Sequence, residues 1–412
     1  MLLDRPLRSG VFLAPYHADD ESPTRQIRRD LDLAEHLDSL GYDEFWVGEH
    51  HSASFETIAS PELFLAAAAE RTRRIRLGTG VVSLPYHNPL MVADRITQLD
   101  HQTEGRLIFG VGPGQLPSDA HMLGIDVANQ REMMNQSLEV LIPLLRGETV
   151  TQRTDWFDLR DARVQLAGPG RPPIEMAVAS AVSPSGPRAA GRHGIGMLSF
   201  AASSAAGFDL LPAHWDVCEQ LAKEHEQNVD RKNWRLVVPM HLAESREQAY
   251  QDISYGILKL VRYFERLGGE DMKSIQTVDE AIEQWIERGL SLLGRAVIGT
   301  PDDAVERITA LQKQSGGFGT ILLLAHDCAN PDRTRNSYNL FADSVMSEVN
   351  SLNRNRHQSL DWFEDNSARI VGELREAIGK TVEAHEAERR ERGEGVGWGD
   401  ARDLLVGKDD GE

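Results

Sequence analysis

An alternation that repeats eight times constrains the fold of this chain more than any other feature of its sequence. Each time, a short apolar run rich in β-branched residues is followed by a loop and then by a segment whose apolar residues recur at helical spacing. This order predicts βα units that share a parallel sheet. The runs expected to form strands are residues 10–14, 45–47, 75–84, 107–111, 174–179, 196–200, 235–242 and 320–325. Eight such units predict an α/β fold, a (β/α)8 TIM barrel.

Several segments do not fit the simple alternation. We expect residues 1–352 to form the barrel, with a small polar excursion at 147–173. Residues 243–299 are too long for one helix and its loop, so a helical insertion is expected near the barrel mouth. Residues 353–392 keep helical spacing and predict a C-terminal extension, whereas the acidic tail 393–412 is expected to be disordered. The extension could pack on the barrel or on a second subunit, and we expect a homodimer.

Composition narrows the class of partner. The chain has 44 basic and 64 acidic residues and a net charge of −20, which disfavours nucleic acid and anionic membrane surfaces. A hydrophobic small molecule is the expected partner. Cys218 and Cys328 lie far apart, which fits a reducing compartment. The N-terminus lacks the apolar core of a signal peptide, and no apolar run reaches the roughly eighteen residues of a membrane span. A cytoplasmic location is expected.

The second predicted strand ends in Gly48, Glu49, His50 and His51. Active sites of TIM barrels are built at the carboxyl ends of the strands, so these side chains are candidates for chemistry. Adjacent strand residues point to opposite faces, which argues against one metal ion held by both histidines. A zinc hydrolase is therefore the minority interpretation. A histidine that faces the mouth could act as a general acid or base, while either one alone could be an ordinary buried residue.

A phosphate site is suggested after the fifth predicted strand. The loop 180–187 carries three serines and a glycine just before a helix, and helix N-termini favour phosphate. Arg131 is a candidate cation for the same group. A capped surface loop with a surface arginine explains these residues equally well.

A second glycine pattern invites a dinucleotide interpretation. Gly110, Gly112 and Gly114 follow the fourth predicted strand. The signal is weak, because Pro113 and Pro117 obstruct an immediate helix and no strand-ending acid follows at the required distance.

Taken together, these motifs resemble a known family. The order of GYDEFWVGEHH at 41–51, then RIRLGTGVVSLPYHNPLMVADRITQLDHQTEGRLIFGVGPG at 74–114, then a helix opening at Arg131, resembles the flavin-dependent luciferase-like monooxygenases. Residues 11–181 look most similar to the limonene 1,2-monooxygenase group. The resemblance implies a TIM barrel of the bacterial luciferase-like type that uses reduced flavin and O2. FMNH2 is the expected flavin, with FADH2 as the other candidate, supplied by a separate NAD(P)H-dependent flavin reductase.

The resemblance also implies roles for individual residues. His50 matches the catalytic histidine, and Gly80–Val81 matches a cis peptide behind the flavin ring. Pro113 stands where luciferase has an arginine and Ser180 replaces an acidic residue, so light emission is not expected. The expected cofactor-binding residues are Gly80, Val81, Gly112, Arg131, Ala179, Ser180, Ser183, Ser185 and Gly186.

Four aromatic residues at predicted strand tips could line an apolar pocket for a terpene or a similar substrate. They are Tyr16, Phe55, Tyr86 and Phe200, and they could equally cap the core. Two other functions fit the same fold. One is F420-dependent hydride transfer, and the other is a non-catalytic flavin-binding partner subunit.

Overall fold

The computed structural model describes residues 6–14, 16–168, 170, 172–268, 270–290 and 293–395. The chain divides into two compact units, Met1–Asn350 and Ser351–Glu412, which are described separately.

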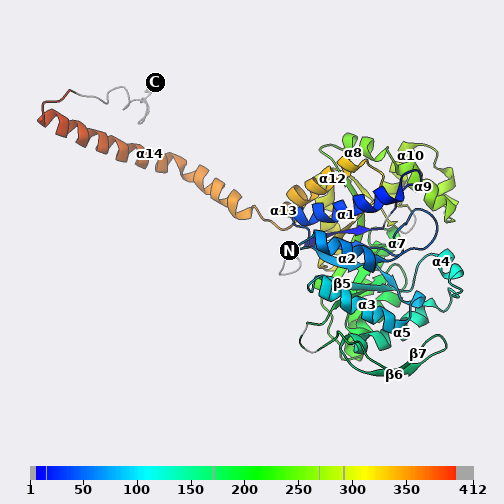
Figure 1. Ribbon diagram of the computed structural model, residues 1–412. Coiled ribbons are helices and arrows are strands. Elements are labelled where there is room, and N and C mark those ends of the chain that lie inside the picture. The colour runs from blue at the N-terminus through cyan, green and yellow to red at the C-terminus, as the bar shows by residue number, and fades with distance from the viewer. Residues whose placement is uncertain are drawn as a thin grey trace. The chain divides into compact units, whose positions relative to one another are not determined.

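Eight parallel strands close into a barrel, which confirms the TIM barrel expected from the sequence (Figure 1). The last strand pairs with both the first and the seventh, so the sheet has no open edge. In order around the barrel the strands are β1 (Arg8–Leu13), β2 (Glu44–Val47), β3 (Arg76–Thr79), β5 (Leu107–Gly112), β8 (Glu175–Ser180), β9 (Gly196–Ser199), β10 (Trp234–Leu242) and β12 (Thr320–Leu324).

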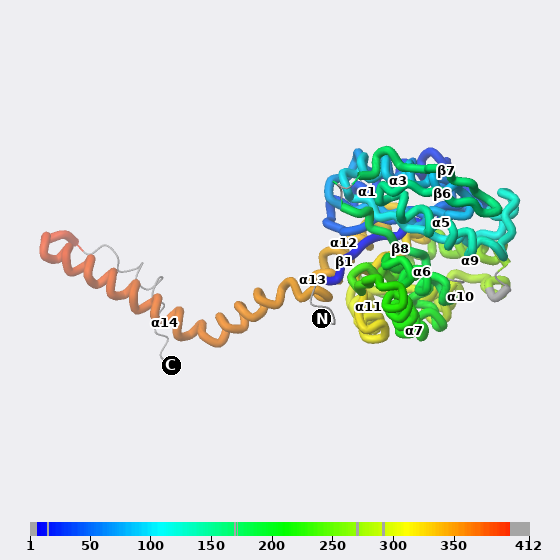
Figure 2. Tube along the Cα trace, turned by 90° about the horizontal axis from the view of Figure 1, so that it is seen from below, coloured from blue at the N-terminus to red at the C-terminus, as the bar shows by residue number. Residues whose placement is uncertain are grey.

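Helices surround the strands. Figure 2 shows α1, α3 and α5 on one side of the strands and α6, α7 and α11 on the other. Five of the barrel helices have proline in the first turn, where its missing N–H costs nothing. The surrounding helices are α1 (Pro23–Leu40), α2 (Pro61–Arg71), α3 (Pro89–Gln102), α5 (Gln130–Leu145), α6 (Ser185–His193), α7 (Ala205–Glu224), α11 (Pro301–Ser315) and α12 (Pro331–Leu340).

Several elements differ from the sequence expectation. The third predicted strand is broken at the cis peptide Gly80–Val81, beyond which β4 (Val82–Ser83) pairs with β5. The polar excursion forms a hairpin of β6 (Val150–Arg153) and β7 (Asp158–Ala162). The last helical segment of the barrel begins with α12 and continues through a π-helical turn, Phe341–Val345, into α13 (Met346–Val349). Short 3-10 turns occur at Leu84–Tyr86, Arg231–Asn233 and Glu270–Ser274.

Among its described residues, the expected helical insertion contains three α-helices. They are α8 (Arg246–Ile253), α9 (Ile257–Arg266) and α10 (Val278–Glu287), followed by β11 (Val297–Gly299), which pairs with β10. These three helices, called the lid below, have a hydrophobic core of their own, separate from the layer between barrel and outer helices. That core includes Phe55 after β2 and Cys328 after β12, so the lid packs on loops at the carboxyl ends of the strands.

The amino-terminal end of the barrel is closed by buried charges. Arg235 is fully buried and pairs with Glu44 at 2.7 Å and with Glu175. Glu44 also accepts a hydrogen bond of 2.9 Å from Trp46, whose ring fills the barrel interior. Each of these charged groups has a partner of opposite charge, and together they fill the amino-terminal end of the barrel. An open site is therefore expected at the carboxyl ends of the strands.

The second unit contains one long helix, α14 (Arg354–Glu391). Most of its side chains are exposed, including Trp362 and Phe363. Apart from residues 393–395, the acidic tail lies outside the described residues, so its disorder stays a prediction. Among the described residues, no helix is long and apolar enough to cross a membrane.

Candidate active site

A cavity of about 340 Å³ lies at the carboxyl ends of the barrel strands, among the loops that follow them. Ten of the residues singled out in the sequence line this cavity, although they come from segments spread over nearly two hundred positions. They are Tyr16, His50, Gly80, Val81, Arg131, Ala179, Ser180, Ser183, Ser185 and Phe200. Strand ends of a barrel converge on one mouth, which explains how distant segments meet.

Two predicted residues lie directly behind the cavity wall. A side chain at Gly112 would collide with Val81 and touch Ala179, and one at Gly186 would collide with the Ala179 carbonyl. Both glycines therefore allow the close packing that shapes the wall.

The other two aromatic predictions need correction. Phe55 does not line the cavity, because its ring stacks on Tyr263 of the lid at a centroid distance of 4.6 Å. Tyr86 lies in a 3-10 turn, where its hydroxyl accepts a hydrogen bond of 3.2 Å from the Gln130 amide. Tyr16 and Phe200 do face the cavity, and Phe200 packs edge-on against Phe12 at 4.8 Å.

His50 is held by two carboxylates. Its Nε2 lies 2.9 Å from Glu56 Oε2 and its Nδ1 lies 3.4 Å from Asp119 Oδ2. Burial opposes the charged ring, but the two carboxylates outweigh it and raise the pKa of His50 to about 10. The ring is therefore an imidazolium at neutral pH, which makes it a proton donor rather than the base that the sequence left open.

Glu49 organises the other two histidines near the mouth. One carboxylate oxygen accepts from His51 Nε2 at 3.0 Å and His87 Nε2 at 2.6 Å, and the other accepts from the Ser83 amide at 2.6 Å. Burial raises the pKa of Glu49, but these donors prevail and lower it. His50 and His51 thus have separate carboxylate partners, as their expected divergence requires.

Sequence reasoning missed Glu56, Asp119 and Tyr263. Glu56 lies in the same loop as His50, so proximity in sequence was a usable signal. Asp119 lies in α4 (Pro117–Met122) and Tyr263 in the lid, and no motif marks either residue. Tyr263 donates a hydrogen bond of 2.9 Å to Glu56 Oε1, which connects the lid to the His50 cluster.

The cavity continues outward into a basic hollow of about 560 Å³ between α5 and α6. Arg131, Ser183 and Ser185 line both spaces, and Arg188 lines the outer one. Among the described residues, the exposed Arg131 and Arg188 side chains have no hydrogen-bond or ion-pair partner. The buried Ser180 hydroxyl also lacks a partner within the part of the chain that is described. These groups remain free to bind an anion.

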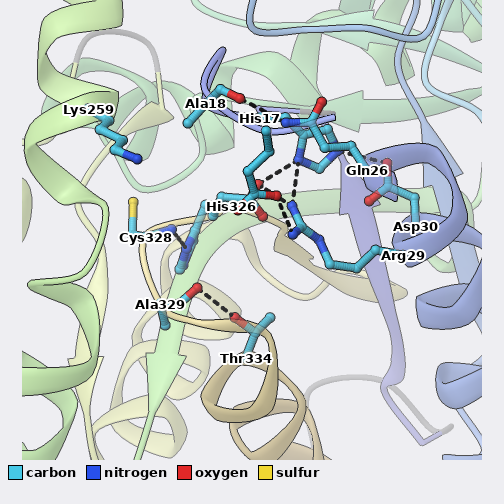
Figure 3. Close-up of polar contacts among 12 residues, drawn as sticks. His17, Ala18, Gln26, Arg29, Asp30, Lys259, His326, Cys328, Ala329 and Thr334 are labelled. Carbon is cyan, nitrogen blue, oxygen red and sulfur yellow. Dashed lines mark hydrogen bonds and ion pairs between the residues drawn. The ribbon is translucent and has the colours of Figure 1, made fainter. Parts of the chain in front are cut away.

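A second polar cluster lies on the far side of Tyr16, between α1 and the loop after β12 (Figure 3). His17 Nδ1 lies 2.6 Å from Asp327 and its Nε2 lies 2.8 Å from Asp30. Arg29 donates to Asp327 at 2.7 Å. The cluster borders a cavity of about 230 Å³ and ties three segments of the barrel together.

A metal site has no support from the arrangement of ligands. Over the residues that the structure describes, no group of three or more His, Cys, Asp or Glu side chains is placed to hold an ion.

Comparison with known proteins identifies the family of this chain. The family model described as luciferase-like monooxygenase matches residues 7–317. Limonene 1,2-monooxygenase of Rhodococcus erythropolis is 48% identical over 341 residues, which is 83% of this chain and 86% of the relative. 4-Hydroxyprotoasukamycin monooxygenase of Streptomyces nodosus subsp. asukaensis is 46% identical over 83% of this chain and 92% of the relative.

Solved structures share the fold. The oxygenating constituent of 3,6-diketocamphane monooxygenase from Pseudomonas putida, a type II Baeyer–Villiger monooxygenase in complex with FMN, has a TM-score of 0.68 and 26% identity, covering 83% of this chain and 98% of that one. The F420-dependent tetrahydromethanopterin reductase of Methanopyrus kandleri has a TM-score of 0.62 at 19% identity, covering 84% and 100%, and shows a likeness of fold alone. From the matched length and the identities, the chain belongs to the luciferase-like monooxygenase family of enzymes.

Proposed function

We propose that this enzyme is a two-component monooxygenase that takes reduced FMN from a separate reductase and uses O2 to oxygenate a hydrophobic small molecule. One observation carries the proposal. An apolar chamber that contains a charged histidine and the unpaired Ser180 hydroxyl is continuous with a hollow that has unpaired cationic groups among the described residues. A flavin mononucleotide has the matching halves, a flat apolar ring and a phosphate.

The basic hollow fits a phosphate. Arg131 and Arg188 supply cations there, and Ser180, which lines the adjoining inner cavity, supplies a buried hydroxyl without a partner among the described residues. The first amides of α6 add donors, because a helix N-terminus favours anions. Arginine binds phosphate through paired N–H groups, which makes such contacts stronger than those between neutral groups.

The inner chamber is suited to keeping water away from the reaction. Phe12, Phe200, Val237 and Leu324 contribute apolar walls. When bound there, reduced flavin would supply the two electrons with which O2 yields one oxygen atom for the substrate and one for water.

His50 would supply a proton. We expect Nδ1 to release it, since its contact with Asp119 is 3.4 Å, whereas Nε2 is held by Glu56 at 2.9 Å. A positioned proton donor of this kind accelerates a reaction by roughly a hundred- to ten-thousandfold.

The substrate class follows from the chamber walls and from the relatives. The relatives' names refer to limonene, 4-hydroxyprotoasukamycin and diketocamphane, and two of these three are terpenoid. We infer that a terpene or a molecule of similar size and polarity is the substrate.

The architecture supports a separate reductase. The described residues form one barrel with its insertions and one long helix, and no dinucleotide-binding fold is present among them. The structural neighbour from Pseudomonas putida is itself called an oxygenating constituent, which supports a two-component system. The homodimer and the cytoplasmic location expected from the sequence stay predictions, and sedimentation velocity would measure the former.

Binding of FMN and of riboflavin tests the phosphate assignment. These ligands share the ring and differ in the phosphate, so fluorescence titration should show tighter binding of FMN. Arg131→Met should weaken FMN roughly ten- to a hundredfold and leave riboflavin unchanged, since a hydrogen bond to a charged group is worth about 1.5–3 kcal/mol. Equal affinity for both ligands would contradict the site. Reduction of F420 without O2 uptake would favour the hydride-transfer alternative.

A further inference from the structure

We propose that Tyr263 of the lid is a positioning residue for His50 and acts through Glu56, so that His50 is fixed for reaction only while the lid is seated. The chemical consequence rests on the function proposed above. The connection from Tyr263 through Glu56 to His50 does not depend on that function, and it can be tested in the protein without any ligand.

Two hydrogen bonds join the lid to the histidine. The Tyr263 hydroxyl donates to Glu56 Oε1 at 2.9 Å, and Glu56 Oε2 lies 2.9 Å from His50 Nε2. Tyr263 is 2% exposed and Glu56 7%, so water cannot readily replace either contact. Both carboxylate oxygens are therefore occupied, one by the lid and one by the histidine.

The same tyrosine also holds the neighbouring residue. Its ring stacks on Phe55 with an interplanar angle of 16°. The backbones of Glu56 and Tyr16 form an isolated antiparallel β-bridge. The centroid of the Tyr16 ring lies 5.8 Å from that of the Tyr263 ring. One lid residue thus holds two consecutive residues of the loop after β2 and touches a residue of the loop after β1.

The lid helices form one packing unit. Its helices pack around their own core, which includes Leu260, Ile282 and Trp285 and is separate from the main core. Cooperative units of this kind open at lower free energy than the whole protein. Displacement of α9 would break the stacking and the hydrogen bond together, because both belong to Tyr263.

Loss of the tyrosine hydroxyl would release Glu56. A buried carboxylate oxygen without a donor is costly, so the side chain would turn into the cavity that it lines and away from His50. The other groups that face His50 are Asp119, whose contact is longer at 3.4 Å, and the neighbouring His51. Neither Asp119 nor His51 would restore the orientation of His50 that Glu56 had fixed.

Nuclear magnetic resonance of ¹⁵N-labelled histidine in the ligand-free protein tests the connection. Tyr263→Phe keeps the stacked ring and removes only the hydroxyl. The matched control is Tyr42→Phe, which removes a buried hydroxyl that donates to the Tyr338 carbonyl at 2.9 Å in the main core. We expect the pKa of His50 to fall by about one unit in Tyr263→Phe, by more in Glu56→Gln, and to stay unchanged in Tyr42→Phe.

The outcomes separate positioning from general stability. Both Tyr→Phe variants lose one buried hydrogen bond and should have lower thermal midpoints, with the larger fall in Tyr263→Phe because its acceptor is charged, but only Tyr263→Phe should shift the pKa of His50. An unchanged or raised His50 pKa in Tyr263→Phe would overturn the proposal. If Glu56→Gln does not fold, the more conservative Tyr263→Phe still decides the question.

Turnover supplies the second measurement. Tyr263→Phe should lower kcat roughly tenfold and change the substrate KM less than twofold, whereas Tyr42→Phe should leave both constants unchanged. An equal loss in both variants would overturn the positioning role. If the wild-type protein shows no oxygenation, the proposed function fails, and the titration of His50 alone then decides whether the lid controls the histidine.

Discussion

Two histidines in neighbouring loops have the same kind of charged partners but lie in different places in the barrel. His17 follows β1 and His50 follows β2, and each has a carboxylate at both ring nitrogens. In both, burial opposes the charge and the carboxylates outweigh it, which raises the pKa of His17 to about 9 and that of His50 to about 10. By charge alone they cannot be told apart.

Access distinguishes them. The His17 side chain is 3% exposed, and its partners belong to α1 and the loop after β12, with Arg29 completing the cluster. The His50 side chain is 13% exposed and lines the apolar cavity. A raised pKa therefore does not identify a reactive histidine. His17 lines a separate, smaller cavity and acts as a cross-link, whereas His50 lines the cavity that the predicted cofactor-binding residues share, which makes it the candidate for chemistry.

The largest expected difference is in turnover. His50→Gln should reduce kcat roughly a hundred- to ten-thousandfold, since it removes the proton donor at the cavity. His17→Gln should leave the kcat of folded protein within about threefold. Steady-state oxygenation assays on both variants make the comparison, and a comparable loss of kcat in folded His17→Gln would break it.

The reverse order is expected for stability. His17→Gln leaves the buried Asp30 without its ion-pair partner, whereas Asp327 keeps Arg29, and breaking a buried pair in this way costs about 3–5 kcal/mol. Urea unfolding should show this loss as a lower midpoint. A variant as stable as the wild type would show that the cluster is not a cross-link.

The free energy of unfolding should also depend on pH through His17. Folding raises the pKa of His17 from 6.5 to about 9, so its contribution is complete below about pH 6.5 and is lost as the pH rises through 9. At about 1.4 kcal/mol per pKa unit, the loss is about 3 kcal/mol. Urea unfolding at pH 6, 7.5 and 9 should show this decline reduced in His17→Gln. An identical decline in the variant would contradict the assignment.

The smallest effect is expected at Ser180. Because its buried hydroxyl has no partner among the described residues, Ser180→Ala should leave the ligand-free protein as stable as before. The same change should weaken FMN by about 1 kcal/mol, roughly fivefold, if the hydroxyl binds the phosphate. Thermal unfolding and FMN titration measure the two effects. Unchanged FMN affinity would remove Ser180 from the phosphate site.

The barrel could be predicted because each strand is a local run of apolar residues. The break at Gly80–Val81 could not be placed from apolarity, since β3 and β4 lie in one continuous run. The resemblance to the family did predict the cis peptide there.

The site was only partly predictable. Ten residues at strand ends were expected correctly near the mouth, because barrel topology brings those ends together. The position of Phe55 was not predicted correctly. Ala53 and Ser54, which precede it, adopt positive φ angles of 67° and 73° and turn the chain toward the lid. Tyr263 lies 207 positions from Glu56, so their contact depends on tertiary packing that no local pattern encodes.

The proposed activity is the transfer of one atom of O2 to an apolar substrate with reduced FMN. The most direct test incubates the purified chain with FMN, a flavin reductase, NADH, limonene and ¹⁸O2, and analyses the products by mass spectrometry. We expect a product that carries one ¹⁸O atom and that forms only when flavin, reductase and enzyme are present together. A panel of terpenes yielding no labelled product, while the chain binds and oxidises reduced FMN, would contradict it.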